Sequence, residues 1–313
     1  MKYPNFLKEN DLVGITALSS GVGNDLKETK ISFNNLKKYF KLIITPNVYG
    51  NFIVSSDIET RVCEFNDLLN EDIKLLYIFR GGDFTYETLD FLDYKKIVNK
   101  NIWISGASDP TSLLYILTTK YDLATIYGFN GKNYDNEILE EYQINNLEIL
   151  KGNLIKQESF MDRNTISMNG NFTSSGIIIG GCLDILRFIP GTSYDNTLNF
   201  IEKYKDKKII WYFDIFAMGS VDVYLTLLQL KNIGWFKYTD TILFGSVLFP
   251  KIECEMDYND VYKKVFPKEN IIYDANIGHI KPVFTIINGS MATIEYKDNK
   301  MTLYEEFLNE NNS

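Results

Sequence analysis

The sequence Ile102-Trp103-Ile104-Ser105-Gly106-Ala107-Ser108-Asp109-Pro110 runs from an apolar stretch through Gly-x-Ser into a proline. Proline is favoured in the first turn of a helix, so this stretch predicts a strand, a sharp turn and a helix. Such a turn is the geometry of a nucleophile elbow, in which a serine hydroxyl, here that of Ser108, protrudes at the end of the strand. The hydrolase motif G-x-S-x-G is only partly met, because its fifth position is Pro110. Alternatively, Ser108 or Asp109 simply caps the helix.

Short apolar runs alternate with amphipathic stretches throughout the first 130 residues. This pattern is typical of βαβ units and predicts a doubly wound α/β layer around a parallel sheet. The predicted strands are 12–18, 41–45, 73–79, 101–105 and 123–127, and the predicted helices are 26–40, 57–70, 85–97 and 110–120. Ligands of such sheets bind at the carboxyl ends of the strands, so we expect the chemistry in the loops after residues 18, 79 and 105.

The second half of the chain is richer in predicted strands. A predicted helix at 136–151 leads into a polar stretch, and apolar runs then recur as far as Tyr296, with an amphipathic helix near 220–232. Asn288-Gly289 predicts a hairpin turn. We therefore expect an N-terminal domain at 1–135, a connecting segment at 136–168 and a β-rich α/β C-terminal domain at 169–313.

The composition excludes several classes of protein. The chain has 313 residues, 45% of them hydrophobic and 23% charged, which favours two globular domains over a disordered chain. Its net charge of -9 argues against a nucleic-acid partner. Three widely spaced cysteines fit a reducing compartment, and neither a signal peptide nor a run of about 18 apolar residues is present. We expect a cytoplasmic protein with no membrane partner.

The single histidine, His279, lies in a Gly-His step of a predicted loop. It excludes a metal site built from several histidines, and we expect neither a metal nor a cofactor. A lone loop histidine is usually solvated or structurally satisfied, but a serine nucleophile needs a base of this kind. Asp214 ends the apolar run 209–213, where a buried acid either orients another group or caps the next helix. The sequence leaves both alternatives open.

Two glycine-containing loops follow predicted strands. Arg80-Gly81-Gly82-Asp83 can aim backbone N–H groups at a ligand or form a plain turn. Residues 17–23 resemble half of a dinucleotide-binding loop but lack its third glycine, and no acidic residue stands at the expected strand end. The sequence gives little support for a dinucleotide cofactor.

Taken together, these segments resemble the muramoyltetrapeptide LD-carboxypeptidase family, a serine peptidase family that also contains the microcin C self-immunity peptidases. The resemblance covers residues 10 to about 296. The segments that carry it are Asn10-Asp11-Leu12-Val13-Gly14-Ile15, Ser19-Ser20, Arg80-Gly81-Gly82, Leu89-Asp90-Phe91-Leu92-Asp93-Tyr94, Gly106-Ala107-Ser108-Asp109, Gly180-Gly181-Cys182-Leu183, Gly191-Thr192, Gly234-Trp235-Phe236 and Gly278-His279.

This resemblance implies a flavodoxin-like N-terminal domain, a β-rich C-terminal domain and a Ser-His-Glu triad. Ser108 would be the nucleophile and His279 the general base and later acid. The acidic member falls on Asp214, which is one methylene shorter than the glutamate of the family pattern. A displacement of about 1 Å can cost about 10²-fold in rate, so either the backbone has shifted or the activity is reduced.

The same resemblance assigns the groups around the nucleophile. The backbone N–H groups of Gly82, Asp83 and Asp109 would bind the oxyanion. Arg80 would clamp the terminal carboxylate of the substrate, or it forms a structural ion pair.

The implied activity is serine-type removal of the terminal D-amino acid from a murein-derived tetrapeptide in the cytoplasm, by a chain whose relatives are commonly homodimers. Ala217-Met218-Gly219-Ser220 departs from the family's Glu-x-Pro-Tyr pattern, and residues 131–175 lack the tryptophan of the immunity-type members. Two alternatives stay open: a peptide-binding member with little or no hydrolysis, and a microcin-type hydrolase of a peptidyl or aminoacyl nucleotide.

Overall fold

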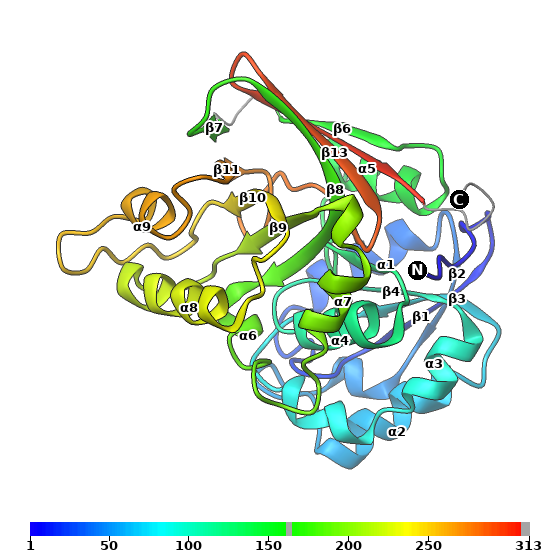
Figure 1. Ribbon diagram of the computed structural model, residues 1–313. Helices are drawn as coiled ribbons and strands as arrows, with labels where there is room; N and C mark the ends of the chain where they lie inside the picture. Colours follow the sequence, from blue (N-terminus) through cyan, green and yellow to red (C-terminus); the bar gives the residue numbers. More distant parts are fainter. Residues whose placement is uncertain (161–164, 308–313) are drawn as a thin grey trace. The chain divides into compact units, whose positions relative to one another are not determined.

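The computed structural model describes residues 1–160 and 165–307. The chain forms two compact units, Met1–Leu154 and Ile155–Ser313 (Figure 1). The division between them falls inside the predicted connecting segment 136–168. Part of the polar stretch predicted there, residues 161–164, lies outside the described residues.

A parallel sheet forms the centre of the N-terminal unit. Its strands in spatial order are β2 (Lys41–Ile44), β1 (Leu12–Thr16), β3 (Ile73–Ile78), β4 (Trp103–Gly106) and β5 (Thr125–Tyr127). Neighbouring strands run parallel throughout. The order 2-1-3-4-5 is the flavodoxin-like form of the doubly wound fold. The predicted fold class of this half is confirmed.

Helices connect these strands. They are α1 (Leu26–Leu36), α2 (Ile58–Leu68), α3 (Tyr94–Lys100), α4 (Thr111–Tyr121) and α5 (Glu141–Leu150), with short 3-10 helices η1 (Pro46–Tyr49) and η2 (Tyr86–Phe91). The single helix predicted at 85–97 is wrong, because the chain is extended at Leu92 between η2 and α3. Asp93 then caps α3 by accepting a hydrogen bond from the Lys96 N–H.

The C-terminal unit is built on a mixed sheet in the order β6-β14-β13-β8-β9-β10-β11-β7. Its strands are β6 (Lys156–Glu158), β7 (Ile166–Ser167), β8 (Phe172–Cys182), β9 (Ile209–Asp214), β10 (Thr239–Gly245), β11 (Asn270–Ala275), β13 (Met291–Lys297) and β14 (Lys300–Glu306), and β12 (Ile286–Asn288) precedes β13. The four strands from β8 to β11 run parallel. Their carboxyl ends therefore lie at one edge of the sheet.

Helices α6 (Leu183–Leu186), α7 (Thr197–Lys203), α8 (Ser220–Ile233) and α9 (Tyr258–Val265) and the 3-10 helix η3 (Lys205–Lys207) complete the unit. Helices α8 and α9 lie side by side (Figure 1). In the core of this unit, the rings of Trp211 and Trp235 stack with their centroids 5.6 Å apart. This packing anchors β9 and thereby its last residue, Asp214.

The predicted hairpin turn at Asn288-Gly289 is wrong. Strand β13 pairs with β8 and β14, and the turn between β13 and β14 is Asp298-Asn299. Both turn residues have positive φ angles, of 51° and 63°, as a two-residue type I′ turn requires. Asparagine and aspartate tolerate this conformation, so the turn needs no glycine.

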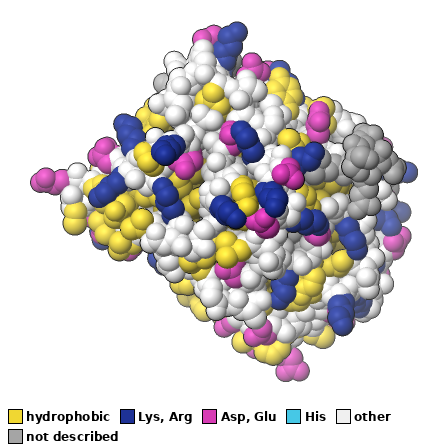
Figure 2. All heavy atoms as spheres, in the orientation of Figure 1, with side chains coloured by type: hydrophobic (Ala, Val, Ile, Leu, Met, Phe, Trp, Pro, Cys, Tyr) yellow, Lys and Arg dark blue, Asp and Glu magenta, His cyan; other side chains and the backbone are white. Residues whose placement is uncertain are grey.

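The distribution of surface charge and the length of the apolar helices concern nucleic acid and membranes as partners. On the face in Figure 2, Lys and Arg side chains are interspersed with Asp and Glu side chains. Within the described residues, none of the helices combines the length and the apolar character that a bilayer span requires.

Candidate active site

The turn after β4 has the geometry of a nucleophile elbow. Ser108 has a φ angle of +69°, a conformation that residues other than glycine rarely adopt and that is found at strained functional turns. Its carbonyl accepts a hydrogen bond from the Thr111 N–H at 2.9 Å, and its own N–H donates to the Tyr127 hydroxyl at 3.2 Å. Pro110 is the cap residue of α4 and makes no side-chain cap. The strand-turn-helix prediction for this segment is confirmed.

The loop Gly81-Gly82 approaches the nucleophile closely. A Cβ atom on Gly81 would lie 3.0 Å from Ser108 Cβ and 3.2 Å from its Oγ. A Cβ atom on Gly82 would lie 2.3 Å from Ser19 Oγ, and the φ angle of Gly82 is +144°. Within the described part of the chain, the Gly82 and Asp109 N–H groups have no protein acceptor. Both remain available to an oxyanion.

The Asp109 side chain holds this loop against the elbow. It is 1% exposed, and its Oδ2 accepts hydrogen bonds from the N–H groups of Phe84 at 3.0 Å and Thr85 at 2.9 Å. Burial raises the pKa of Asp109, although the hydrogen bond from Thr85 opposes this. Asp83 itself is exposed. The Asp109 side chain therefore orders the loop instead of capping α4.

Arg80 is buried at the start of the same loop. It forms an ion pair with Asp25, and its guanidinium donates to the Gly21 carbonyl at 3.2 Å and lies over the Phe52 ring. The hydrogen bond from Arg80 lowers the pKa of Asp25. These contacts fit the alternative in which Arg80 forms a structural ion pair. Its role as a clamp for the substrate's terminal carboxylate stays a prediction.

Asp214 and His279 meet in the C-terminal unit. Asp214 Oδ1 lies 2.9 Å from His279 Nδ1, and the side chains of Asp214 and His279 are 1% and 19% exposed. Burial of the ring lowers the pKa of His279, but the hydrogen bond and the charge of Asp214 outweigh it and raise the pKa above its ordinary value. Of the two alternatives for Asp214, orienting another group or capping the next helix, the geometry fits the first, and the group is the His279 ring.

Gly278 makes this pair sterically possible. A Cβ atom at position 278 would lie 2.0 Å from Asp214 Oδ1, and the φ angle of Gly278 is +97°. Sequence reasoning gave this glycine no role of its own. A signal was present, because a glycine directly before the only base marks a place where another group approaches the backbone.

The segment after Asp214 borders the imidazole. The Phe216 ring centroid lies 4.7 Å from that of His279. Asp184 accepts hydrogen bonds from the N–H groups of Phe216 at 2.9 Å and Ala217 at 3.1 Å. Asp184, which also contributes to the raised pKa of His279, was missed in the sequence. It directly follows Gly180-Gly181-Cys182-Leu183, one of the segments that carry the family resemblance.

The predicted residues thus form two groups, each within one unit. Ser108, Gly82 and Asp109 lie together in the N-terminal unit, and Asp214 and His279 pair in the C-terminal unit. Meeting of the two groups in one triad stays a prediction. Among the described residues, no cluster of three or more His, Cys, Asp and Glu side chains could hold a metal ion.

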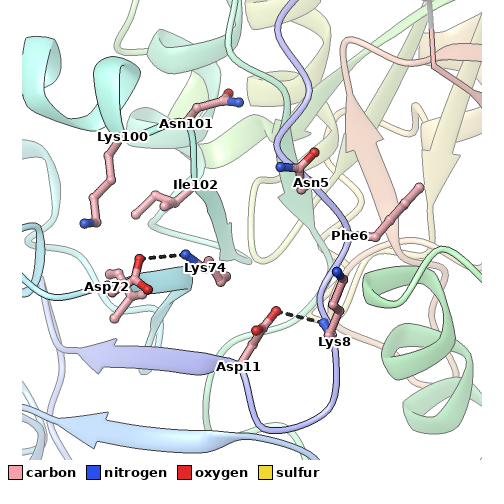
Figure 3. Close-up of a pocket in the computed structure, with 10 residues that line it drawn as sticks. Asn5, Phe6, Lys8, Asp11, Asp72, Lys74, Lys100, Asn101 and Ile102 are labelled. Atoms are coloured by element: carbon pink, nitrogen blue, oxygen red, sulfur yellow. Dashed lines mark hydrogen bonds and ion pairs between the residues drawn. The ribbon is translucent and has the colours of Figure 1, made fainter.

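The N-terminal unit contains a cavity of about 670 Å³, and none of the residues that line it belongs to the elbow. Figure 3 shows its lining residues. Its lining includes Asp11, Asp72 and Asn101, which lie one or two residues before β1, β3 and β4 respectively. It contains the ion pair between Lys74 and Asp72. Ligands of this fold bind at the opposite, carboxyl ends of the strands, so this cavity is not the candidate active site.

Comparison with known proteins agrees with this division. Residues 13–128 match the model of the LD-carboxypeptidase N-terminal domain, and residues 175–294 match that of the LD-carboxypeptidase C-terminal domain. The chain is 23% identical over 310 residues to the microcin C7 self-immunity protein MccF of Escherichia coli, covering 87% of this chain and 86% of that protein.

Two solved structures share the fold. The microcin C7 self-immunity protein MccF in complex with aspartyl sulfamoyl adenosine has a TM-score of 0.82 at 19% identity, covering 99% of this chain and all of that one. The muramoyltetrapeptide carboxypeptidase of Oxalobacter formigenes has a TM-score of 0.77 at 18% identity, covering 95% of this chain and all of that one. With both of its domains matched in order, the chain belongs to the LD-carboxypeptidase family of serine peptidases.

Proposed function

We propose that the chain is a serine-type LD-carboxypeptidase that removes the terminal D-amino acid from a murein-derived tetrapeptide. The observation that carries the proposal is the buried Asp214 carboxylate at 2.9 Å from His279 Nδ1. A buried carboxylate that faces one imidazole nitrogen fixes the ring and leaves Nε2 for a nucleophile, as in other serine hydrolases. The strained Ser108 elbow supplies that nucleophile.

In the proposed mechanism, Ser108 Oγ attacks the carbonyl carbon of the L,D peptide bond while His279 takes its proton. Asp214 stabilises the imidazolium, and the N–H groups of Gly82 or Asp83 and of Asp109 donate to the oxyanion. His279 then protonates the amine of the D-amino acid as the C–N bond breaks. Water, deprotonated by the same histidine, releases the acyl group and restores Ser108.

The proposal also includes the location of the enzyme and its oligomeric state. Wall recycling implies a cytoplasmic enzyme that takes small peptides, and the family resemblance suggests a homodimer. Sedimentation of the purified chain would detect the dimer. A monomer at all concentrations would contradict the proposed homodimer and would leave the proposed reaction unaffected.

The geometry bears on the non-hydrolytic alternative. A binding protein has no need for a buried acid that orients the only histidine, or for a nucleophile held at positive φ. Because such strain costs free energy, its retention supports turnover. The departures at residues 217–220 then concern which substrate is taken.

The alternative of a microcin-type hydrolase has support of its own. The curated relative is a microcin C7 self-immunity protein, and a structure of that name holds aspartyl sulfamoyl adenosine. The absence of tryptophan from residues 131–175 argues against nucleotide stacking of the kind implied for immunity-type members. A screen of the purified chain on a murein tetrapeptide and on an aminoacyl sulfamoyl adenosine separates the two substrates.

The test of the chemistry uses a fluorophosphonate probe and the tetrapeptide assay. The wild-type chain should become labelled and should release D-alanine, while Ser108→Ala and His279→Ala should lose at least about 10³-fold in kcat. Ser175→Ala, which changes an exposed serine, is the matched control. Wild-type turnover by His279→Ala would show the triad assignment to be wrong.

A further inference from the structure

The rings of Phe216 and Phe249 form an exposed aromatic pair in the C-terminal unit. Their centroids lie 5.2 Å apart with the rings at 88°, which is an edge-to-face contact. Phe216 is 37% exposed and Phe249 is 58% exposed. The other neighbour of the Phe216 ring is the imidazole of His279, with 4.7 Å between the centroids. The aromatic pair therefore offers apolar surface directly beside the histidine that we propose as general base and acid.

The three rings come together because three neighbouring strands end at one edge of the sheet. Strands β9, β10 and β11 run parallel, and Phe216, Phe249 and His279 follow their respective carboxyl ends by two to four residues. Ligands of open α/β sheets bind outside the carboxyl ends of parallel strands. The aromatic pair thus lies where a substrate is expected.

Backbone hydrogen bonds hold the aromatic pair in place. The Phe249 N–H donates to the Phe216 carbonyl at 3.0 Å, and the Leu248 N–H donates to the Ile215 carbonyl at 3.3 Å. The Phe216 N–H donates in turn to Asp184 at 2.9 Å. Because the segments that carry the two rings are already ordered, binding an apolar group there costs little further conformational entropy.

The proposed reaction determines which part of the substrate comes to this place. Asp214 occupies Nδ1 of His279, so Nε2 must protonate the amine of the leaving residue. Such a transfer requires about 2.6–3.2 Å between the two nitrogen atoms. The Cα atom of the leaving residue is one bond of about 1.5 Å from its amine. Its side chain therefore begins next to the imidazole, where Phe216 is the aromatic neighbour.

We propose that Phe216 and Phe249 bind the side chain of the leaving D-amino acid, and that the chain prefers a large apolar residue such as D-leucine to D-alanine. A single methyl group is too short to cover two rings whose centroids are 5.2 Å apart. A side chain of four carbons removes apolar surface of both rings from water. The inference rests on the proposed function, because it takes His279 as the acid that protonates the leaving amine.

The test compares two tetrapeptides that differ only in the fourth residue, D-alanine or D-leucine. We expect kcat/KM for the D-leucine peptide to be at least about tenfold higher, since extra carbons in an apolar site give discrimination of this order. Phe249→Ala should bring the ratio of the two kcat/KM values close to one, and Phe249→Leu, which keeps an apolar side chain, should retain a preference of about threefold. Equal kcat/KM values in the wild-type chain would overturn the inference.

A matched variant shows whether the effect belongs to the aromatic pair. Ile252 is also apolar and exposed, and it follows Phe249 in the same segment after β10. Ile252→Ala should keep the wild-type ratio of kcat/KM values. Because Phe249 is more than half exposed, Phe249→Ala should keep the wild-type fold. An equal fall of the ratio in both alanine variants would also overturn the inference.

A binding measurement separates this inference from the proposed function. Calorimetric titration of the Ser108→Ala variant with the two intact peptides needs no turnover. The D-leucine peptide should bind about tenfold more tightly, and adding Phe249→Ala should remove the difference. This result without hydrolysis by the wild-type chain would count against the proposed function alone. Hydrolysis of both peptides with equal binding and equal kcat/KM would overturn the inference alone.

Discussion

A Cβ atom at position 278 would lie 2.0 Å from Asp214 Oδ1, far inside van der Waals contact. The absence of a side chain at Gly278 lets the backbone pass the carboxylate, so that the ring of the next residue, His279, lies 2.9 Å from it and is oriented by it. The pair therefore depends on three residues, of which one contributes only space.

Gly278→Ala should separate this pair. The added methyl group displaces Asp214 or His279, and a misplacement of about 1 Å can cost about 10²-fold in kcat. The control is Gly191→Ala, because Gly191 also has a positive φ, of 80°, but no atom within 4 Å of an added Cβ. An equal loss of kcat in both variants would assign the effect to backbone strain instead of to the pair.

Asp214→Glu tests whether the site is built around the shorter acid. Asp214 is 1% exposed and already at hydrogen-bond distance from His279, so an extra methylene has no free space. We expect kcat to fall by about tenfold or more. A rise in kcat on a tetrapeptide would mean instead that the natural aspartate is a weakened form of the family glutamate.

Asp214→Asn should change the pH dependence of turnover. Asp214 raises the pKa of His279, and the general base must be neutral, so the acidic limb of kcat/KM in the wild-type chain lies above pH 6.5. Without the charge of Asp214, the acidic limb of kcat/KM should move to lower pH. The plateau value of kcat/KM should fall by about 10³- to 10⁴-fold. An unchanged limb would show that another group governs it.

The same shift has a consequence for stability. A histidine whose pKa is raised on folding stabilises the protein fully below its unfolded value, and this contribution is lost as the pH rises through the folded value. The difference in melting temperature between the wild-type chain and Asp214→Asn should therefore be largest at about pH 5.5 and narrow above the pKa of His279.

Glu305 predicts a second pH effect, away from the site. Burial raises the pKa of Glu305 to about 8, although Ile287 N–H and Ser290 Oγ donate to its Oε1. The folded chain thus holds this proton up to a higher pH than the unfolded chain does. Linkage then requires that stability falls as the pH rises from about 4.5 to about 8.

Glu305→Gln should remove most of that dependence, because the amide oxygen can still accept both hydrogen bonds and carries no charge. Melting temperatures between pH 5 and 9 measure it, with Glu306→Gln on the same strand as the control. If Glu305→Gln and the wild-type chain lost stability in parallel over this range, the assignment to Glu305 would be wrong.

The sequence predicted those features whose causes are local. The Ser108 elbow follows from a strand, a glycine and a proline within nine residues, and the parallel sheet follows from periodicity. Predictions from local sequence were wrong where two neighbouring signals favoured different structures. Asp93 begins a new helix inside a region of helical pattern, and Asp298-Asn299 forms the turn expected at Asn288-Gly289.

Other features depend on residues that are distant in the chain. Gly278 faces Asp214 across 64 positions, and Asp184 meets Phe216 across 32. A single sequence contains no information about such contacts.

The hydrogen bonds from the Phe216 and Ala217 N–H groups to Asp184 have a consequence for how this segment tolerates substitution. Both donors are backbone groups, so these bonds do not depend on which side chains the segment carries. Mutations there can alter what the site accepts while the bend that leads away from Asp214 keeps its course. We therefore expect substitutions at residues 217–220 to leave the backbone after Asp214 and the Asp214–His279 pair in place.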